Sequence, residues 1–340
     1  MRTFLINSAS YIVYLLPFSL LTGPFLPDLS VVIVSIIFIF LSLKYKLLSY
    51  FKNRYFIFFI IFYIYIVISS LFSDFKVHSL SSSLFYFRFI IFSLAIWFLI
   101  NEKKDFLKIF SIFLLTAFSI ALFDGYYQYF FNENIFGYSS KLTRLNILLN
   151  DDLILGGYLA RLMPLMIGLI ILHFGDNKFY IASILFFIIS CDVLIYLSGE
   201  RTALGLLFLS TILIIIFVKK FKLIRLFSFL LSILIILTFT ILSPEIKKRN
   251  IDHTINQLGF NSIISKSNDN DVDKSRLYIF SPQHHSYIIT SLNIFLSKPV
   301  LGSGPNAFRY LCSDETFSHD DLSCSTHPHN SYAQIFSEIG

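Results

Sequence analysis

The segment STHPHNSYAQIFSEIG, at positions 325–340, places His327 and His329 at the end of a chain that is otherwise strongly apolar. An imidazole accepts a proton near neutral pH, so a histidine can help a hydroxyl group to attack an electrophile. Arginines bind phosphate oxygens through paired hydrogen bonds and keep their charge. Arg88, Arg161 and Arg201 lie within or beside apolar runs. Together these residue types predict group transfer from a lipid diphosphate, in which arginines stabilise the leaving diphosphate and a histidine assists the acceptor hydroxyl.

The composition indicates a chain embedded in a lipid bilayer. Hydrophobic residues make up 56% of the 340 positions, charged residues make up 14%, and the mean hydropathy is +0.72. Soluble domains contain about 25% charged residues. The net charge is +6, but Lys and Arg form short clusters between apolar runs. That arrangement is typical of membrane orientation signals and not of nucleic-acid binding.

The apolar runs predict an all-α, polytopic membrane helix bundle over residues 1–243. A spanning helix needs about 17–25 mostly apolar residues. The first run lacks a small-residue cleavage site, so we interpret it as a retained helix and not as a removed signal peptide. Nine runs meet the length requirement: 5–26, 29–48, 55–72, 84–100, 106–130, 153–174, 179–197, 202–218 and 223–243.

The charges between the runs orient the bundle. The strongest positive clusters, at 44–54 and 219–225, fall at even-numbered connections, which places these connections in the cytoplasm. The amino terminus is therefore predicted to be cytoplasmic, and the polar stretch 244–330 to be one large periplasmic loop. A Ser-Pro start at position 281 predicts a short amphipathic helix within this loop. His284 and His285 begin that helix and are interpreted as solvated.

Cysteine usage fits the predicted topology. Cys312 and Cys324 both lie in the outer loop, whereas Cys191 lies alone in an apolar run. Thiols outside the cytoplasm tend to pair, which predicts a Cys312–Cys324 disulfide. Two free thiols are one alternative, and a zinc site that adds His327 and His329 is another. The lack of a C-x-x-C spacing argues against zinc.

Ionisable residues inside apolar runs are costly, so each one is a functional hypothesis by default. A transporter is expected to place charges at the midplane and along a path through both membrane halves. The one-sided distribution here favours chemistry at the outer face, although a structural ion pair between Arg161 and Asp192 remains an alternative for those two residues. The predicted orientation places six such residues in the outer half or at the outer rim: Arg88, Asp124, Arg161, Asp192, Glu200 and Arg201.

The C-terminal motif resembles that of the O-antigen ligase and O-antigen polymerase family of bacterial membrane glycosyltransferases. In that family a large outer loop precedes a histidine, then Asn, Ser or Gln, nine residues and a glycine. His329 and Asn330, followed after nine residues by Gly340, are similar to this motif. Ligases and polymerases share the pattern, so the choice between them stays open.

Two further elements are similar to arginine elements of the same family. The turn SGERTA at 198–203 is similar to the first, and Ser275-Arg276 followed by KPVLGSGP at 298–305 is similar to the second. The run DDLILGG at 151–157, followed by Arg161, also resembles a run that opens a mid-chain span in some members.

The resemblance implies specific roles for these residues. Arg201 and Arg276 are expected to contact the lipid diphosphate, and His329 to activate or position the acceptor hydroxyl. The implied reaction needs no metal and no cofactor. Its donor is a glycan on undecaprenyl diphosphate, and its acceptor is lipid A core or a growing glycan, at the periplasmic face of the bacterial inner membrane. Further candidate substrate contacts are Arg88, Arg161, His327 and Glu200.

The residues after the motif are interpreted as the start of a truncated transmembrane helix, 331–340. Ten residues follow Asn330, too few for a span, whereas the family pattern implies a complete tenth helix. An alternative function is a flippase or other transporter of lipid-linked oligosaccharides, and a third is a non-catalytic membrane assembly protein. The sequence contains no P-loop, G-x-S-x-G or dinucleotide motif, which argues against nucleotide-driven chemistry.

Overall fold

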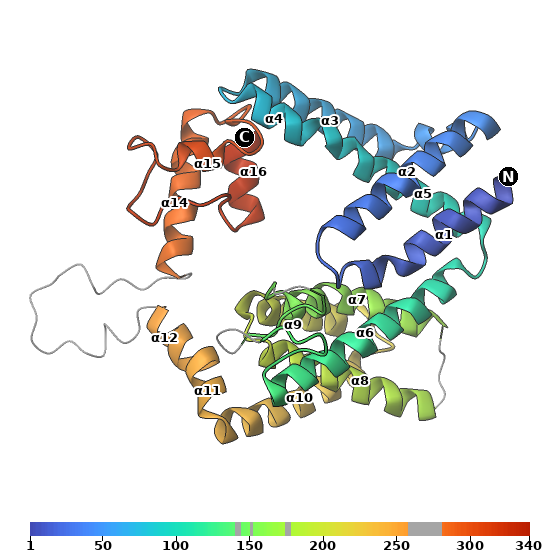
Figure 1. Cartoon of the computed structure of the whole chain (residues 1–340), viewed down its shortest axis with the longest axis vertical. Coiled ribbons are helices and arrows are strands. Elements are labelled where there is room, and N and C mark those ends of the chain that lie inside the picture. The colour runs from blue at the N-terminus through green and yellow to red at the C-terminus, as the bar shows by residue number, and fades with distance from the viewer. Residues whose placement is uncertain (140–143, 150–151, 174–177, 258–280) are drawn as a thin grey trace, which may run out of the picture. The chain divides into compact units, whose positions relative to one another are not determined.

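The computed structural model describes residues 1–139, 144–149, 152–173, 178–257 and 281–340 (Figure 1). Over these residues the chain is helical and contains no β-strand, which confirms the predicted all-α class. The helices are α1 (Arg2–Ser19), α2 (Phe25–Tyr45), η1 (Leu48–Lys52), α3 (Arg54–Phe72), α4 (Lys76–Ser83), η2 (Leu84–Tyr86), α5 (Phe87–Glu102), α6 (Phe106–Phe131), α7 (Leu155–His173), α8 (Lys178–Leu197), α9 (Arg201–Phe217), α10 (Lys222–Leu242), α11 (Pro244–Lys247), η3 (Lys248–Asp252), α12 (His253–Gln257), α14 (Pro282–Ser297), α15 (Phe308–Leu311) and α16 (Ser331–Ile339).

Each predicted apolar run overlaps one of these helices, because a helix satisfies every backbone hydrogen bond within its own segment. The segments 183–197 and 201–217 are apolar but shorter than the others, so the count of nine spans stays a prediction. Among the described residues, six helical stretches are long and apolar enough to cross a membrane: Phe25–Tyr45, Arg54–Phe72, Lys76–Glu102, Phe106–Phe131, Leu155–His173 and Lys222–Leu242.

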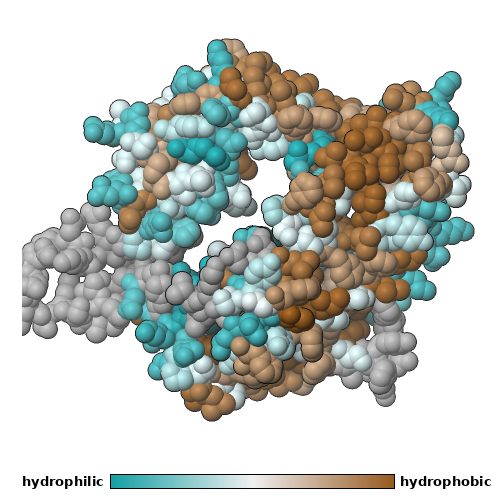
Figure 2. Space-filling view, in the orientation of Figure 1, coloured by the Kyte–Doolittle hydropathy of each residue, from teal (hydrophilic) through white to brown (hydrophobic). Residues whose placement is uncertain are grey.

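The outward faces of the early helices are apolar, as a lipid environment requires. Ile36 of α2, Phe58 of α3 and Trp97 of α5 are exposed. Figure 2 shows hydrophobic colour over the early helices and hydrophilic colour over much of the C-terminal segment. Together with the six long apolar helices, this surface indicates a multi-pass membrane protein.

The chain forms two compact units that each combine two stretches of sequence. Unit 1 contains residues 1–37 and 95–252, and unit 2 contains residues 38–94 and 253–340. The units are defined by packing and not by membrane topology. The boundaries predicted at positions 243 and 330 therefore stay predictions.

Unit 1 is built around α6 to α10, with α1 packed along α6 (Figure 1). Phe118, Leu159 and Leu194 are among its fully buried side chains. Gly125 allows α6 to approach α8 closely, since a Cβ at this position would press on the Leu194 side chain. These helices hold the ends of α7 and α9 side by side.

A buried ion pair crosses the core of unit 1. Asp192 of α8 binds Arg225 of α10 through two hydrogen bonds of 2.8 and 3.2 Å, and both side chains are 0% exposed. Ser232 donates a hydrogen bond of 2.9 Å to Asp192, and the Arg225 guanidinium also binds the Thr211 hydroxyl. The interpretation that Asp192 pairs with Arg161 is therefore wrong. Arg225, assigned from sequence to a cytoplasmic basic cluster, instead points into the helix core.

Unit 2 joins α3 to the C-terminal segment by a row of hydrogen bonds. The Tyr65 hydroxyl donates to the carbonyls of Val300 and Ile339, one turn before Ser69 donates to Leu301 at 2.6 Å. Beyond the end of α3, the ring of Phe75 stacks on that of Tyr310 with centroids 4.7 Å apart. The segment that carries His329 is thus fixed to a predicted membrane span within the same unit.

Two residues of the C-terminal motif, Asn330 and Gly340, lie on either side of α16. Asn330 caps α16 by accepting hydrogen bonds from the amides of Tyr332 and Ala333 at 3.0 and 3.1 Å. The nine residues of α16 are followed by Gly340, whose φ is +99° and whose missing Cβ leaves room for the Val300 carbonyl. The H-N-x9-G motif therefore contains the Asn330 cap, nine helical residues and a glycine that contacts the 298–305 turn.

Gly302 allows that turn to touch α16. Its φ is +63°, and a Cβ would overlap the backbone of Glu338 and Ile339. The next amides, of Ser303 and Gly304, donate to the carbonyls of Ser337 and Glu338 at 3.1 and 2.8 Å.

Gly302→Ala is expected to lower the free energy of unfolding by about 2–4 kcal/mol, because it combines backbone strain with steric overlap. The measurement is denaturant or thermal unfolding of the purified protein in detergent. Gly205→Ala is the matched control. A Cβ at Gly205, within α9, meets no atom within 4 Å, so this change should be neutral or stabilise by up to about 1 kcal/mol. Equal unfolding curves for the two variants would contradict the packing role of Gly302.

Candidate functional site

Unit 1 gathers three arginines from separate segments, here called the arginine group: Arg144, Arg201 and Arg249. Arg144 lies in the connection between α6 and α7, Arg201 is the first residue of α9, and Arg249 lies in η3. The positive charges of Arg144 and Arg201 both act on Arg249, and that of Arg144 acts on Arg201. Like charges repel, so a group of this kind is stabilised by an anion.

Arg144 donates a hydrogen bond that orients it, and a second of its N–H groups has no acceptor among the described residues. Its Nη2 donates to the Leu153 carbonyl at 2.9 Å. Its Nε is buried without a hydrogen-bond partner among the described residues. Arg249 lies in η3, after α10 and α11. Burial lowers the pKa of Arg249, and the charges of Arg144 and Arg201 lower it further. The group therefore combines positive charges that repel one another with a buried N–H that no described residue accepts.

Glu200 fixes the turn that presents Arg201. Its carboxylate accepts hydrogen bonds from the amides of Gly156 and Gly157 at 2.8 and 3.1 Å, at the start of α7. Burial raises the pKa of Glu200, and the Gly157 amide and the Arg144 charge lead the effects that oppose this rise. Glu200 thus caps the start of α7 and joins α7 to α9, and its role as a substrate contact stays a prediction.

The two glycines of the 151–157 run are needed for this junction. A Cβ on Gly156 would overlap the Ser198 hydroxyl, and a Cβ on Gly157 would lie 3.1 Å from the Glu200 carboxylate. The sequence elements at 151–157 and 198–203 therefore pack on each other. Arg161, one turn further along α7, is exposed and acts on Glu200 through its charge.

Unit 2 gathers three imidazoles, here called the histidine group: His284, His327 and His329. The ring centroid of His329 lies 4.1 Å from that of His327 and 5.9 Å from that of His284. The ring of Tyr287, one turn after His284 on α14, lies 5.6 Å from His329. The interpretation of His284 as merely solvated is therefore wrong, because its half-buried ring faces the motif histidine. The neighbouring His285 instead lies 5.8 Å from His319.

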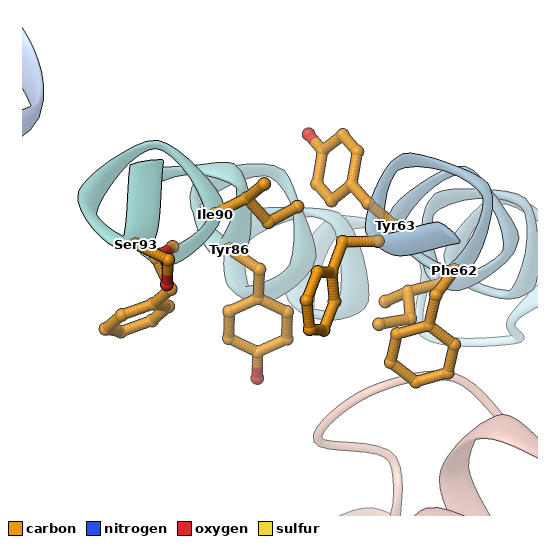
Figure 3. Close-up of a pocket in the computed structure, with 8 residues that line it drawn as sticks. Phe62, Tyr63, Tyr86, Ile90 and Ser93 are labelled. Atoms are coloured by element: carbon orange, nitrogen blue, oxygen red, sulfur yellow. The ribbon is translucent and has the colours of Figure 1, made fainter. Parts of the chain in front are cut away.

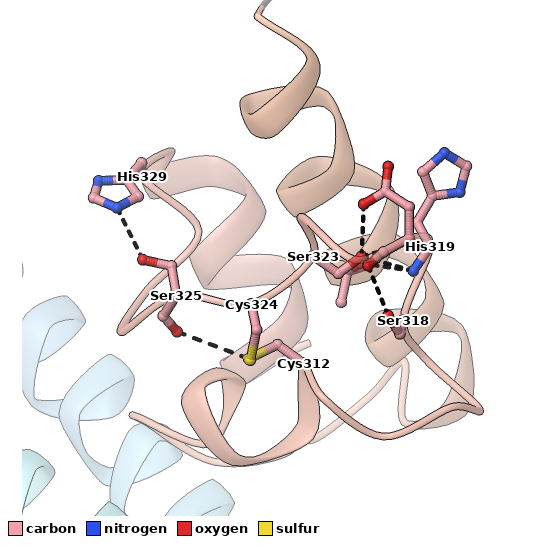
Figure 4. The surroundings of a disulfide bond; sticks show 9 residues. Cys312, Ser318, His319, Ser323, Cys324, Ser325 and His329 are labelled. Atoms are coloured by element: carbon pink, nitrogen blue, oxygen red, sulfur yellow. Dashed lines mark hydrogen bonds between the residues drawn. A yellow bond between two sulfur atoms is a disulfide. The ribbon is translucent and has the colours of Figure 1, made fainter.

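His329 is held in an unusual conformation beside a hydroxyl. Its φ of +54° lies in the left-handed region, which few non-glycine residues occupy and which is concentrated at functional sites. Its Nε2 lies 3.0 Å from the Ser325 Oγ (Figure 4). Partial burial lowers the pKa of His329, and the charges of His327 and then His284 lower it further. An uncharged imidazole of this kind can accept a proton at neutral pH.

A disulfide joins Cys312 to Cys324 and anchors the segment that carries the histidine group (Figure 4). Ser325, the hydrogen-bond partner of His329, follows Cys324 directly. On the other side of the loop, Cys312 is fully buried against Tyr287, Ile294 and Phe308. The cross-link therefore ties the His329 segment to the small core beneath α14.

Residues 184–340 match a family model described as O-antigen ligase. This part of the chain is similar to the O-antigen ligase family. The match begins in α8 and includes Arg201, the histidine group and Gly340. No curated protein and no solved structure matches the chain. The family match supports a glycosyltransferase of the O-antigen ligase type, which acts on a lipid-linked glycan and an acceptor.

Within the matched residues 184–340, Arg201 lies in unit 1 and His329 lies in unit 2. Arg276 lies outside the described residues. Arg88, which precedes the segment, is half-buried near the start of α5, with its guanidinium 4.8 Å from the centre of the Phe89 ring. Among the described residues, no three His, Cys, Asp or Glu side chains are grouped to hold a metal ion.

Sequence reasoning missed Arg144, Arg249 and His284. Arg144 and Arg249 belong to no motif and lie in connections, where basic residues are common. Position 284 begins an amphipathic helix, and the pattern alone does not show which neighbour the side chain meets. The one available signal was the number of arginines near the predicted outer ends of spans.

A separate apolar cavity of about 340 Å3 lies between α3 and α5 in unit 2 (Figure 3). Phe62 and Tyr63 of α3 face Tyr86, Ile90 and Ser93 from the end of η2 and from α5 (Figure 3). None of its lining residues is a predicted site residue. A cavity with this lining suits an apolar chain better than a glycan or a diphosphate.

Proposed function

We propose that the chain transfers a glycan from undecaprenyl diphosphate to an acceptor hydroxyl at the periplasmic face of the inner membrane. The acceptor is lipid A core or a growing glycan. The observation that carries the proposal is the arginine group, in which the positive charges act on one another and Arg144 has a buried Nε that no described residue accepts. A diphosphate offers the charge and the acceptor oxygens that such a group lacks.

Each residue group is assigned one role in the proposed reaction. The bond from the first sugar carbon to the diphosphate oxygen breaks, and the same carbon forms a bond to the acceptor oxygen. Negative charge grows on the diphosphate, where the arginine group and Arg276 stabilise it without a metal ion. The proton of the acceptor hydroxyl passes to His329, which is oriented by Ser325.

The proposal includes the predicted topology. Nine spans starting from a cytoplasmic amino terminus put residues 244–330 in the periplasm, with 331–340 beginning a further span. The Cys312–Cys324 disulfide supports this placement, because disulfides persist in the periplasm and are rare in the cytoplasm.

Complementation of a strain that lacks O-antigen ligation tests the proposal. The wild-type chain should restore glycan on lipid A core, seen as a ladder in gels of extracted lipopolysaccharide. Arg201→Ala and Arg144→Ala should each reduce the ladder about 10- to 100-fold, because each removes a charged contact worth about 1.5–3 kcal/mol. The control Arg2→Ala removes an exposed arginine of unit 1, paired with Glu102, and should leave the ladder intact. A full ladder from Arg201→Ala, at equal protein levels, would contradict the proposal.

A further inference from the structure

The histidine group contains more imidazoles than a single proton acceptor requires. His327 and His284 lie 4.1 and 5.9 Å from His329, measured between ring centroids. Two imidazolium ions at these separations repel each other by roughly 0.7–1 kcal/mol in bulk water, and by more where water is partly excluded, which corresponds to about half to one pH unit. A positive charge on either neighbour therefore makes protonation of His329 harder.

The rings that face His329 come from its own segment and from α14. His327 is exposed on the segment next to His329. His284 is fixed at the start of α14, where its Nδ1 lies 2.6 Å from the Ser281 hydroxyl. The other titratable group of α14 that faces His329 is Tyr287, whose phenol does not become a cation in this range. The pKa of His329 is lowered first by partial burial and then by the two neighbouring histidines.

We propose that the imidazoles of His284 and His327, packed beside that of His329, keep His329 uncharged into mildly acidic pH. This inference rests on the proposed function, in which an uncharged His329 accepts the proton of the acceptor hydroxyl. His284 is a positioning residue, because it acts through His329 and not on the substrate.

The sign of the effect follows from electrostatics. His284→Gln removes a neighbour that can become positive, so protonation of His329 becomes easier. The acid limb of the pH profile of transfer should move up by about half to one pH unit, with an unchanged rate at pH 8. His284→Lys places a permanent charge near the same position and should move the limb down. A purely structural defect would lower the rate at every pH.

The direct test is the titration of His329 in the full-length protein in detergent. Histidine labelled with 13C gives a ring signal for each residue, and His329→Gln assigns the signal of interest. The midpoint for His329 should rise by about half to one pH unit in His284→Gln and fall in His284→Lys. His285→Gln is the matched control: its ring faces His319, and it should leave the midpoint unchanged.

The outcomes separate this inference from the proposed function. An unchanged His329 midpoint in both His284 variants would overturn the inference, whatever the transfer activity. A midpoint that moves as expected, together with full transfer by His329→Ala, would support the coupling among the histidines and contradict the proposed function.

Discussion

Replacement of His329 by alanine is expected to lower the rate of glycan transfer by about 10²–10⁴-fold, because it removes the group that accepts the proton of the acceptor hydroxyl. The rate is measured at pH 8 with purified protein, a lipid-diphosphate glycan and a saturating acceptor. The thermal unfolding curve should stay close to that of the wild type, since the His329 side chain is exposed. Binding of the donor should also be retained, because the arginine group is intact.

Two further variants separate proton transfer from other roles of His329. His329→Gln can keep a hydrogen bond to Ser325 but cannot accept a proton at the working pH, so it should be as slow as the alanine variant. His319→Ala removes an exposed imidazole that lies beside His285 and should leave the rate unchanged. A glutamine variant with wild-type activity would show that hydrogen bonding, and not proton transfer, is the contribution of this residue.

Arg225→Met is expected to lower the free energy of unfolding by about 3–5 kcal/mol, because it leaves the Asp192 carboxylate buried without its partner. The ion pair is 0% exposed on both sides, so water cannot replace the lost contact. The double variant Asp192→Leu with Arg225→Met removes both charges and should recover most of the loss. Unfolding in detergent, followed by circular dichroism, gives the three free energies.

The exposed ion pair of the same unit provides the control for this result. Arg2 and Glu102 are 2.7 Å apart, with side chains 43% and 28% exposed. Arg2→Met should therefore change stability by no more than about 1 kcal/mol. If Arg225→Met were as stable as Arg2→Met, the buried pair would not bind as the structure shows.

The helices could be predicted from the sequence because the hydrogen bonds that form them connect residues close together in the chain. A run of apolar residues long enough to cross a bilayer has few conformations other than a helix that satisfy its backbone. The H-N-x9-G motif was also readable, and the structure explains its spacing through the Asn330 cap and the close contact at Gly340.

The partners of charged residues could not be predicted from the sequence, because they depend on how helices that are distant in sequence pack together. Asp192 could have paired with any nearby cation, and Arg225 was assigned to a surface cluster because its neighbours are lysines. The same limit explains why Arg144 and His284 went unnoticed: each gains its significance from residues far along the chain.

Covalent product formation in detergent solution tests the central claim most directly. The purified chain is mixed with a glycan on undecaprenyl diphosphate and with lipid A core, without added nucleotide. Detergent micelles contain no separate compartments, so translocation alone cannot change either lipid. The account predicts lipid A core that carries the glycan, together with one equivalent of released undecaprenyl diphosphate. Recovery of both lipids unchanged, from folded protein, would contradict it.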